Sequence, residues 1–227
     1  MKRRLLPRRR DPAIRQLLHV MAVLRSPEGC PWDREQDHRT LRFHAVEEVY
    51  ELLDAIEAGD DVEMREELGD LLLQVVFHCQ LAGERKAFDF EAVAQNLVDK
   101  LVRRHPHVFG DVTVRDVDQV WANWEQIKRT EKQGTRHERP SVFDGIPRHL
   151  PGLLRAEKLV KKARKAGLPA GAPASKRRWT RATLARELFS LAATAQQKGW
   201  SAEELLRAEI ARRERELRRQ ERRAAKA

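Results

Sequence analysis

The sequence predicts an all-α protein folded as an antiparallel helical bundle. Apolar residues recur at the three-to-four-residue spacing of amphipathic helices along most of the 227 residues. Short breaks rich in glycine, proline and charge separate these segments, and short loops favour antiparallel neighbours. No segment shows a convincing strand pattern, and no glycine-rich phosphate loop is present. The chain is long enough for one substantial core, or for one domain with a smaller appendage.

The first part of the chain contains five predicted helices. They span residues 14–24, 40–58, 61–82, 90–104 and a segment from Asp116 or Asp118 through Lys128. Asp60 or Asp61 is the expected N-cap of the third of these helices, and Asp89 is that of the fourth. Residues 32–36 are expected to be a polar loop. Pro106 lies in a turn that ends the fourth helix.

The C-terminal part is more basic and more often interrupted. Residues 134–152 are rich in proline, glycine and charge, which predicts a linker, and residues 167–175 form a flexible connector. Further helices are expected over residues 153–166, 183–195 and 202–227. The predicted organisation is a basic N-terminal arm (1–12), a helical domain (13–133), the linker (134–152) and a basic C-terminal segment (153–227).

The net charge of +10 comes from the two ends of the chain. Residues 1–10 carry +6 and residues 151–227 carry +13, whereas residues 11–150 carry −9. A basic end can attract nucleic acid or another polyanion, but a solvated helix surface and a basic arm give the same composition. Both interpretations stay open.

Cysteine usage and hydropathy predict a cytoplasmic protein. Cys30 and Cys79 form no CxxC pair or disulfide framework, which fits a reducing compartment. Cys79 falls on an apolar helix face and is expected in the core. No apolar run reaches the roughly 18 residues of a membrane span, and no secretory signal follows the basic start. An organellar transit peptide is not excluded by composition.

The first acidic helix, residues 40–58, has a regular apolar stripe. Its expected core residues are Val46, Val49, Leu53 and Ile56, and Glu47, Glu48 and Glu51 lie on the opposite side. Taken alone, this pattern is what an ordinary surface helix shows.

The second acidic helix, residues 61–82, is apolar on two sides. One face carries Leu68, Leu71, Leu72, Val75 and Cys79, the other Leu73, Phe77 and Leu81, and a polar strip of Glu67, Asp70, Gln74 and His78 runs between them. A helix of this kind is normally buried on both faces, and unpaired buried carboxylates are costly. Glu67 and Asp70, like Glu48 and Glu51, are three residues apart and share a face. An antiparallel hairpin would bring the two pairs together around an ion or a basic partner.

Carboxylates without clustered histidine or cysteine suit hard ions, Mg²⁺ or Mn²⁺, better than Zn²⁺. Mg²⁺ held in this way commonly takes substrate phosphates as further ligands. A di-iron carboxylate bundle is the structural rival. It requires two Glu-x-x-His motifs, and only Glu35 and His38 have that spacing, before the acidic helix.

Cations and aromatic residues follow the acidic helices. Lys100 and Arg104 are four residues apart at a helix end, where they could compensate the helix dipole or clamp a triphosphate. Trp124 and Lys128 have the same spacing, which suits a base and a phosphate, but Trp124 could equally be a core residue. His44 and His78 are expected to support the acidic ligands and not to bind metal themselves.

The acidic pattern resembles a known family. Glu47-Glu48-x-x-Glu51 followed by Glu67-x-x-Asp70 is similar to the EExxE…ExxD signature of the MazG-type nucleoside triphosphate pyrophosphohydrolases. Residues 30–33, 67–72, 103–109 and 124–128 resemble further stretches of that family, in the same order. The similarity covers roughly residues 14–166.

The resemblance implies an all-α catalytic domain over residues 13–133 that forms a homodimer or a higher oligomer. It also implies Mg²⁺-dependent hydrolysis of NTPs or dNTPs to monophosphate and pyrophosphate, with Mn²⁺ as a substitute ion. Nucleotide-pool housecleaning and control of a signalling nucleotide pool both stay open as its role. By position, the implied metal ligands are Glu48, Glu51, Glu67 and Asp70. Glu47, or a ligand such as Glu48, is the implied base. Lys100 and Arg104 match phosphate-binding positions, and Trp124 and Lys128 match a nucleotide-binding pair.

The C-terminal segment departs from two-domain members of that family. Residues 185–190 resemble the second acidic helix, but Ser190 stands where Asp70 stands in the first copy, and Glu216 stands at the arginine position. We interpret residues 153–227 as a truncated second copy that cannot bind metal. Two alternatives to an enzyme stay open: a nucleotide-sensing module whose basic end binds nucleic acid or protein, and a structural dimer without activity.

Overall fold

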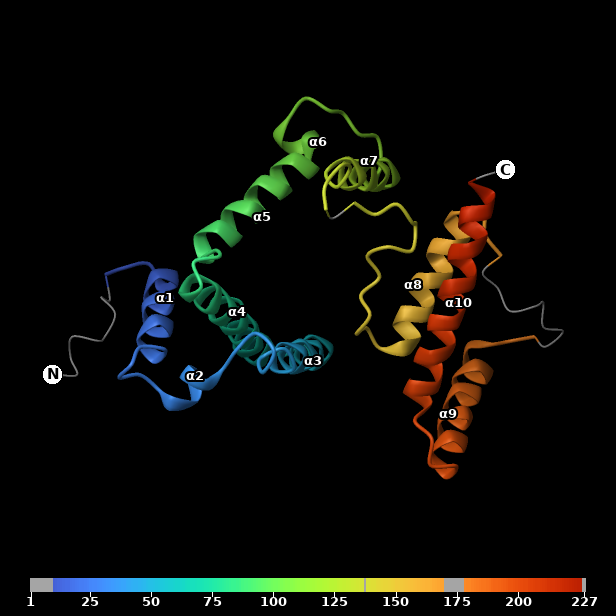
Figure 1. The fold of residues 1–227 in the computed structure, drawn as a ribbon, viewed down its shortest axis with the longest axis horizontal. Helices are drawn as coiled ribbons and strands as arrows, with labels where there is room; N and C mark the ends of the chain where they lie inside the picture. The colour runs from blue at the N-terminus through green and yellow to red at the C-terminus, as the bar shows by residue number, and fades with distance from the viewer. Residues whose placement is uncertain (1–9, 137, 170–177, 226–227) are drawn as a thin grey trace. The chain divides into compact units, whose positions relative to one another are not determined.

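The computed structural model describes residues 10–136, 138–169 and 178–225, and within these ranges every regular element is a helix, as the sequence predicts. The helices fall into two compact units, Met1–Arg115 and Asp116–Ala227 (Figure 1). The predicted basic arm (1–12) and connector (167–175) lie mostly outside the described residues. The predicted domain boundaries stay a prediction.

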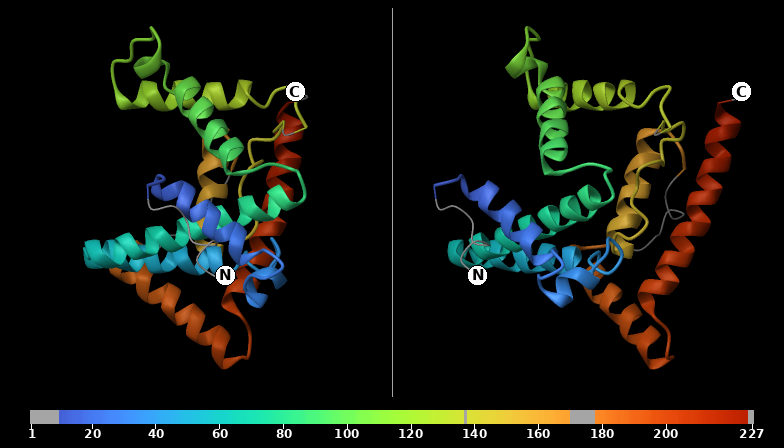
Figure 2. Two further views of the ribbon diagram at one scale, coloured as in Figure 1. Left: turned by 90° about the vertical axis from the view of Figure 1, so that its left-hand side faces the viewer. Right: turned by 60° about the vertical axis from the view of Figure 1, so that its left-hand side comes forward.

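The first unit is organised around one long helix. Its elements are α1 (Ala13–Leu24), α2 (Pro31–Glu35), α3 (His44–Ala58), α4 (Asp61–Glu84), α5 (Phe90–Arg104) and α6 (Pro106–Phe109). Helix α3 folds back along α4 as an antiparallel hairpin, and α1 packs across the same helix (Figures 1 and 2). Helix α5 continues from the C-terminal end of α4, so α4 contacts three of the other helices.

The core of this unit lies between α1 and α4. It is formed by Met21, Leu41, Val76, Phe77 and Leu81, with further apolar side chains of α1 packed against them. Burial of a large apolar side chain stabilises the fold by about 1.5–3 kcal/mol, so this cluster is the main attachment of α1 to α4. Cys79 is also buried, at 4% exposure, as its apolar face predicts.

A two-residue turn closes the α3–α4 hairpin. Gly59 ends α3 with φ +68°, in the left-handed region where a side chain would be strained. The Asp60 carboxylate then accepts hydrogen bonds from the backbone N–H groups of Val62 (2.9 Å) and Glu63 (3.2 Å). Asp60, and not Asp61, is therefore the N-cap of α4. Asp89 caps α5 by accepting from Ala92 N–H, as predicted.

Three sequence expectations near α3 and α5 were wrong. Residues 32–36 are not a loop, because Pro31 takes the first helical position, where its missing N–H is not needed, and starts α2. Helix α3 begins at His44 instead of residue 40. The Asp37 carboxylate accepts from the N–H groups of Arg39 and Thr40 and stabilises a turn there. The turn expected at Pro106 is the short helix α6.

Arg25 fastens the segment before α3 to the end of α4. Its guanidinium donates to both carboxylate oxygens of Glu84, at 2.6 and 2.8 Å, and to the carbonyls of Asp33 and Gln36. This hydrogen bonding holds the pKa of Glu84 below its usual range. The Arg25 side chain is only 9% exposed. The 33–36 segment is therefore held in place. Since His38 lies two residues after this segment, its position is restrained as well.

The second unit contains α7 (Val117–Thr130), α8 (Gly152–Lys165), α9 (Arg181–Gln197) and α10 (Ala202–Ala224). Helices α8 and α10 pack along each other, and α9 contacts α10. Its buried cluster consists of Phe143, Leu159, Ala163, Ile210 and Leu217. Phe143 comes from the predicted linker, and that stretch is packed because Lys162 donates to two of its carbonyls.

None of the described helices combines the length and the apolar composition needed to cross a bilayer.

Candidate functional site

The orientation of α3 differs from the sequence expectation. Its predicted core stripe, Val46, Val49, Leu53 and Ile56, is 41–51% exposed. The face that meets α4 instead carries Glu48, Leu52 and Ala55, all buried or half-buried. The prediction failed because a stripe on one side of a helix packs only where a partner exists, and within the described chain that partner is lacking. The consequence is that Glu48 points into the hairpin.

The two apolar faces of α4 also differ in how far they are buried. Phe77 and Leu81 lie in the core, as predicted, whereas Leu68, Leu72 and Val75 are 39–51% exposed. The prediction that both faces are buried is therefore wrong for this chain on its own. The polar strip between them does face α3, and Gln74 in that strip is 93% buried.

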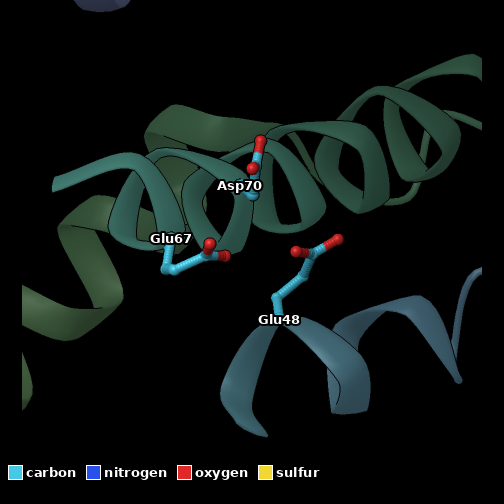
Figure 3. A group of neighbouring side chains, drawn as sticks. All are labelled: Glu48, Glu67 and Asp70. Carbon is cyan, nitrogen blue, oxygen red and sulfur yellow. The ribbon is translucent and has the colours of Figure 1, made fainter. Parts of the chain in front are cut away.

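Three carboxylates from the two helices converge. Glu48 reaches from α3 toward Glu67 and Asp70 on α4 (Figure 3). One carboxylate oxygen of each residue lies within 4.8 Å of those of the other two, and all three side chains are half-buried. Within the described ranges, this is the one group of three or more acidic, histidine or cysteine side chains with such geometry.

The cluster is electrostatically unfavourable on its own. Desolvation and the neighbouring charge of Asp70 raise the pKa of Glu48 above its usual range, while a hydrogen bond from Gln74 acts in the opposite direction. Desolvation and the charges of Glu51, Asp70 and Glu48 likewise raise the pKa of Glu67. Like charges held together in a poorly hydrated site favour either protonation or a cation.

These residues fit a hard divalent cation. The donor set is made of carboxylate oxygens, which Mg²⁺ and Mn²⁺ prefer, and it contains no thiolate or imidazole. An ion would also relieve the repulsion that raises the two pKa values. Glu48, Glu67 and Asp70 are therefore able to hold a metal ion together.

The other predicted acidic residues lie at the edge of this cluster. Glu51 is exposed and is not one of the three converging residues, although its charge is close enough to raise the pKa of Glu67. Glu47 is exposed on α3, with its carboxylate 3.6 Å from Nδ1 of His44. The ligand role of Glu51 and the base role of Glu47 stay predictions.

The predicted phosphate-binding cations are not brought to the cluster within one chain. Lys100 and Arg104 lie in the C-terminal half of α5, and α5 leads away from the α3–α4 hairpin (Figure 1). Glu67 and Asp70 are in the first half of α4, about 20–25 Å along the helix axis from its C-terminal end. Their phosphate-binding role stays a prediction.

Trp124 and Lys128 lie on α7, in the second compact unit. The Lys128 ammonium sits 4.8 Å from the centre of the Trp124 ring and 3.1 Å from a carboxylate oxygen of Glu125. Trp121 packs edge-to-face on Trp124, with ring centres 5.2 Å apart. The predicted pair therefore forms a cation–π contact, and its role in nucleotide binding stays a prediction.

The sequence interpretation did not assign the polar contacts that continue from the cluster. Gln74 Nε2 donates to a carboxylate oxygen of Glu48 at 3.2 Å. Farther along α4, Nδ1 of His78 lies 2.8 Å from Nδ1 of His38, whose Nε2 is 2.9 Å from a nitrogen of Arg85. The four-residue spacing of Asp70, Gln74 and His78 was a signal for one continuous strip. The pairing with His38 is tertiary and has no local signal.

The comparisons with known proteins agree with this geometry. The sequence model of the MazG nucleotide pyrophosphohydrolase domain matches residues 36–109, which include the whole cluster. A Streptomyces cacaoi protein, an uncharacterised 26.1 kDa protein in the blaB 3′ region, is 48% identical over 167 residues, covering 72% of this chain and 67% of that protein. This chain belongs to the MazG family.

Other MazG-family relatives carry functional names. A nucleoside triphosphate pyrophosphohydrolase of Escherichia coli K12 is 49% identical over 156 residues, covering 68% of this chain and 58% of that protein. The nucleoside triphosphate pyrophosphohydrolase/pyrophosphatase MazG of Thermotoga maritima is 45% identical over 152 residues, covering 67% and 57%. The match thus spans less than two thirds of the length of these two relatives. A crystal structure of a MazG-related protein from Thermotoga maritima aligns with 50% of this chain at 25% identity, with a TM-score of 0.43.

Proposed function

We propose that this chain is a nucleoside triphosphate pyrophosphohydrolase, which hydrolyses NTPs or dNTPs to the monophosphate and pyrophosphate in nucleotide-pool housecleaning. The observation that carries the proposal is the cluster of Glu48, Glu67 and Asp70 on two facing helices of a MazG-family chain. The names of the Escherichia coli and Thermotoga maritima relatives support the same reaction.

The proposed cofactor is Mg²⁺, with Mn²⁺ as a substitute, held by Glu48, Glu67 and Asp70, with Glu51 as a fourth ligand. An ion of this kind lowers the pKa of a bound water and offsets phosphate charge. The carboxylate-only donor set supports this choice of ion. The rival di-iron site is disfavoured because the cluster contains no histidine.

We assign the remaining roles to other protein groups. A water molecule attacks the α-phosphorus, its proton passes to a carboxylate, either Glu47 or Glu48, and the bond from the α-phosphorus to the bridging oxygen breaks as pyrophosphate leaves. Lys100 and Arg104 stabilise the charge of the leaving pyrophosphate. Trp124 and Lys128 contact the nucleotide.

Incubation of the purified protein with each NTP and dNTP plus Mg²⁺ tests this proposal. We expect pyrophosphate release that falls by on the order of 100-fold in Glu48→Gln and in Asp70→Asn, because each removes a ligand charge. Glu66→Gln, one residue from Glu67 but outside the cluster, is the matched control and should keep full activity. No release, or release that the two ligand variants leave undiminished, would contradict the proposal.

We also propose that the active form is a homodimer. The α3–α4 hairpin exposes many large apolar side chains, among them Val46, Val49, Leu53 and Ile56 on α3, and Leu68, Leu72 and Val75 on α4. Such a surface is typical of a protein–protein interface. A second copy would cover it and could bring its own α5 cations to this cluster, which one chain does not.

A second candidate function is polyanion binding by the outer side of α10. Arg215, Arg219, Arg222 and Arg223 are exposed there and form no ion pair with the described residues. The acids of the same stretch are already engaged: Glu209 by Arg212 and Arg213, Glu214 by Arg155 and Arg218, and Glu221 by Ser141. The outer arginine stripe therefore carries uncompensated charge, which suits a nucleic-acid backbone.

The salt dependence of nucleic-acid binding tests this second function. Replacing Arg215 and Arg219 by glutamine should reduce the slope of log K against log salt by about 2, because each phosphate contact contributes about 0.9. The matched control replaces Arg212 and Arg213, which are paired with Glu209. No binding at low salt, or equal loss in both double variants, would contradict this function.

A further inference from the structure

The polar strip of α4 contains a buried amide that touches the acidic cluster. Gln74 is 93% buried, and its Nε2 donates to Oε1 of Glu48 at 3.2 Å. The reverse amide orientation would place two acceptor oxygens against each other, so the N–H₂ group faces the carboxylate. The other end of the amide, Oε1, is buried and accepts no hydrogen bond from the described residues.

One turn farther along the same strip, two histidines and an arginine form a second series of contacts. Nδ1 of His78 lies 2.8 Å from Nδ1 of His38, and the planes of the two rings are nearly parallel, with an interplanar angle of 11°. On its other side, Nε2 of His38 lies 2.9 Å from a guanidinium nitrogen of Arg85.

The hydrogen bond with Arg85 determines which ring nitrogen of each histidine carries the proton. Because a guanidinium can only donate, Nε2 of His38 must be the acceptor and carries no proton. His38 therefore carries its proton on Nδ1 and donates it to Nδ1 of His78. Since that nitrogen of His78 accepts, its proton lies on Nε2, and His78 ends the chain with an N–H donor directed away from His38.

These two series of contacts each end in an atom without a hydrogen-bond partner in the described part of the chain, one a donor and the other an acceptor. His78 offers a donor at Nε2 that no described residue accepts, and Gln74 offers an acceptor at Oε1 that no described residue fills. The two residues are four apart on one helix face, so their side chains are neighbours. One bridging water, which accepts from Nε2 of His78 and donates to Oε1 of Gln74, would join them.

We propose that Arg85, His38, His78 and Gln74 form a hydrogen-bond relay that positions Glu48 for metal binding. Every donor in the relay points toward Glu48, from the arginine cation at one end to the carboxylate at the other. Gln74 thereby holds one oxygen of Glu48 and leaves the second oxygen for the ion. Partners of this kind fix the orientation of a metal ligand, and their loss commonly lowers metal affinity 10- to 100-fold. The inference rests on the proposed metal-dependent function and names four positioning residues for it.

The protonation pattern is the first test, and it does not depend on activity. Long-range ¹H–¹⁵N NMR spectra of the metal-free protein near neutral pH distinguish the tautomers of each histidine. We expect His38 protonated at Nδ1 and His78 protonated at Nε2. A His38 ring with its proton on Nε2 would overturn the relay, because Arg85 could not then donate to it.

The second test is direct binding of Mn²⁺ to the substrate-free protein, followed by electron paramagnetic resonance. Gln74→Met keeps the side-chain length but removes both amide groups, and we expect it to weaken Mn²⁺ binding about tenfold. Gln80→Met is the matched control, since Gln80 lies on the same helix and bonds Glu84 instead of the cluster. Thermal melts of both variants check that the fold is retained. Unchanged Mn²⁺ affinity in Gln74→Met would overturn the inference.

A double-mutant cycle tests whether the histidines act through Gln74. His78→Phe alone should weaken Mn²⁺ binding, and it should have no further effect in the Gln74→Met background. Additive losses would show that His78 does not act through Gln74 and would overturn the relay. Wild-type protein that binds no Mn²⁺ would overturn the proposed metal site itself, a result distinct from a site that binds Mn²⁺ but ignores Gln74.

Discussion

At the scale of single residues, the acidic cluster opposes the stability of the chain that contains it. Glu48 and Glu67 have raised pKa values because they are partly desolvated and close to other carboxylates. Functional sites commonly carry such strain, which a bound ligand relieves. Metal binding at this cluster is therefore expected to change the stability of the protein through Glu48 and Glu67.

The first prediction concerns Glu67. In EDTA, Glu67→Gln should melt at a higher temperature than the wild-type protein, because it removes like-charge repulsion with Glu48 and Asp70. With Mg²⁺ present the order should reverse, since the variant loses the stabilisation that a bound ion supplies. Calorimetry in both conditions measures this, with Glu66→Gln as the control. A variant that is less stable in EDTA would contradict the prediction.

The second prediction concerns pH. Desolvation and the neighbouring His38 lower the pKa of His78, so the folded state favours the neutral ring. The unfolded chain then binds more protons than the folded chain as pH falls below about 6.5, and stability is lost in that range. Urea titrations at pH 7.5 and 5.5 should show that the stability advantage of wild type over His78→Gln shrinks at the lower pH. An advantage that is constant or grows would count against the neutral relay.

At the scale of elements, the α3–α4 hairpin depends on its two-residue turn. Asp60→Ala should lower the free energy of unfolding by about 1 kcal/mol, because it removes the cap that satisfies the N–H groups of Val62 and Glu63. Asp61→Ala, at the neighbouring position, should cost less because that residue does not cap the helix. Urea unfolding curves measure both, and an equal cost at the two positions would contradict the assignment.

The long helices were predictable, whereas the short helices α2 and α6 and the orientation of α3 were not. Apolar spacing located α1, α4 and α5 to within a few residues, and local chemistry predicted the Asp89 cap. The spacing also showed which residues of α3 share a face. It did not show which face meets α4, because that depends on partners elsewhere in space.

The candidate site was predictable only where local sequence patterns determine it. The pairing of Glu48 with Glu67 and Asp70 followed from two motifs with a common spacing and a short turn between their helices. The contact of His78 with His38, which also meets Arg85, joins the strip to a loop that lies 40 residues earlier in the chain. No local pattern encodes such a contact.

At the scale of the whole molecule, the exposed hairpin face predicts self-association. Leu53→Asp should convert the dimer to a monomer, weakening association by about tenfold or more, since it places a charge in an apolar interface. Light scattering after size-exclusion chromatography measures the mass directly. Val112→Asp, a similar change at an exposed apolar residue outside the hairpin, should leave the dimer intact. Wild-type protein that is monomeric at micromolar concentration would contradict the proposed dimer.

The reaction itself is measured by ³¹P NMR of the products that the protein forms from an NTP and Mg²⁺ in ¹⁸O-labelled water. We expect nucleoside monophosphate and pyrophosphate in equal amounts, with the label in the monophosphate, because water attacks the α-phosphorus. Asp70→Asn should form neither product at an appreciable rate. Release of nucleoside diphosphate and inorganic phosphate, or label in the pyrophosphate, would contradict the proposed pyrophosphohydrolase activity.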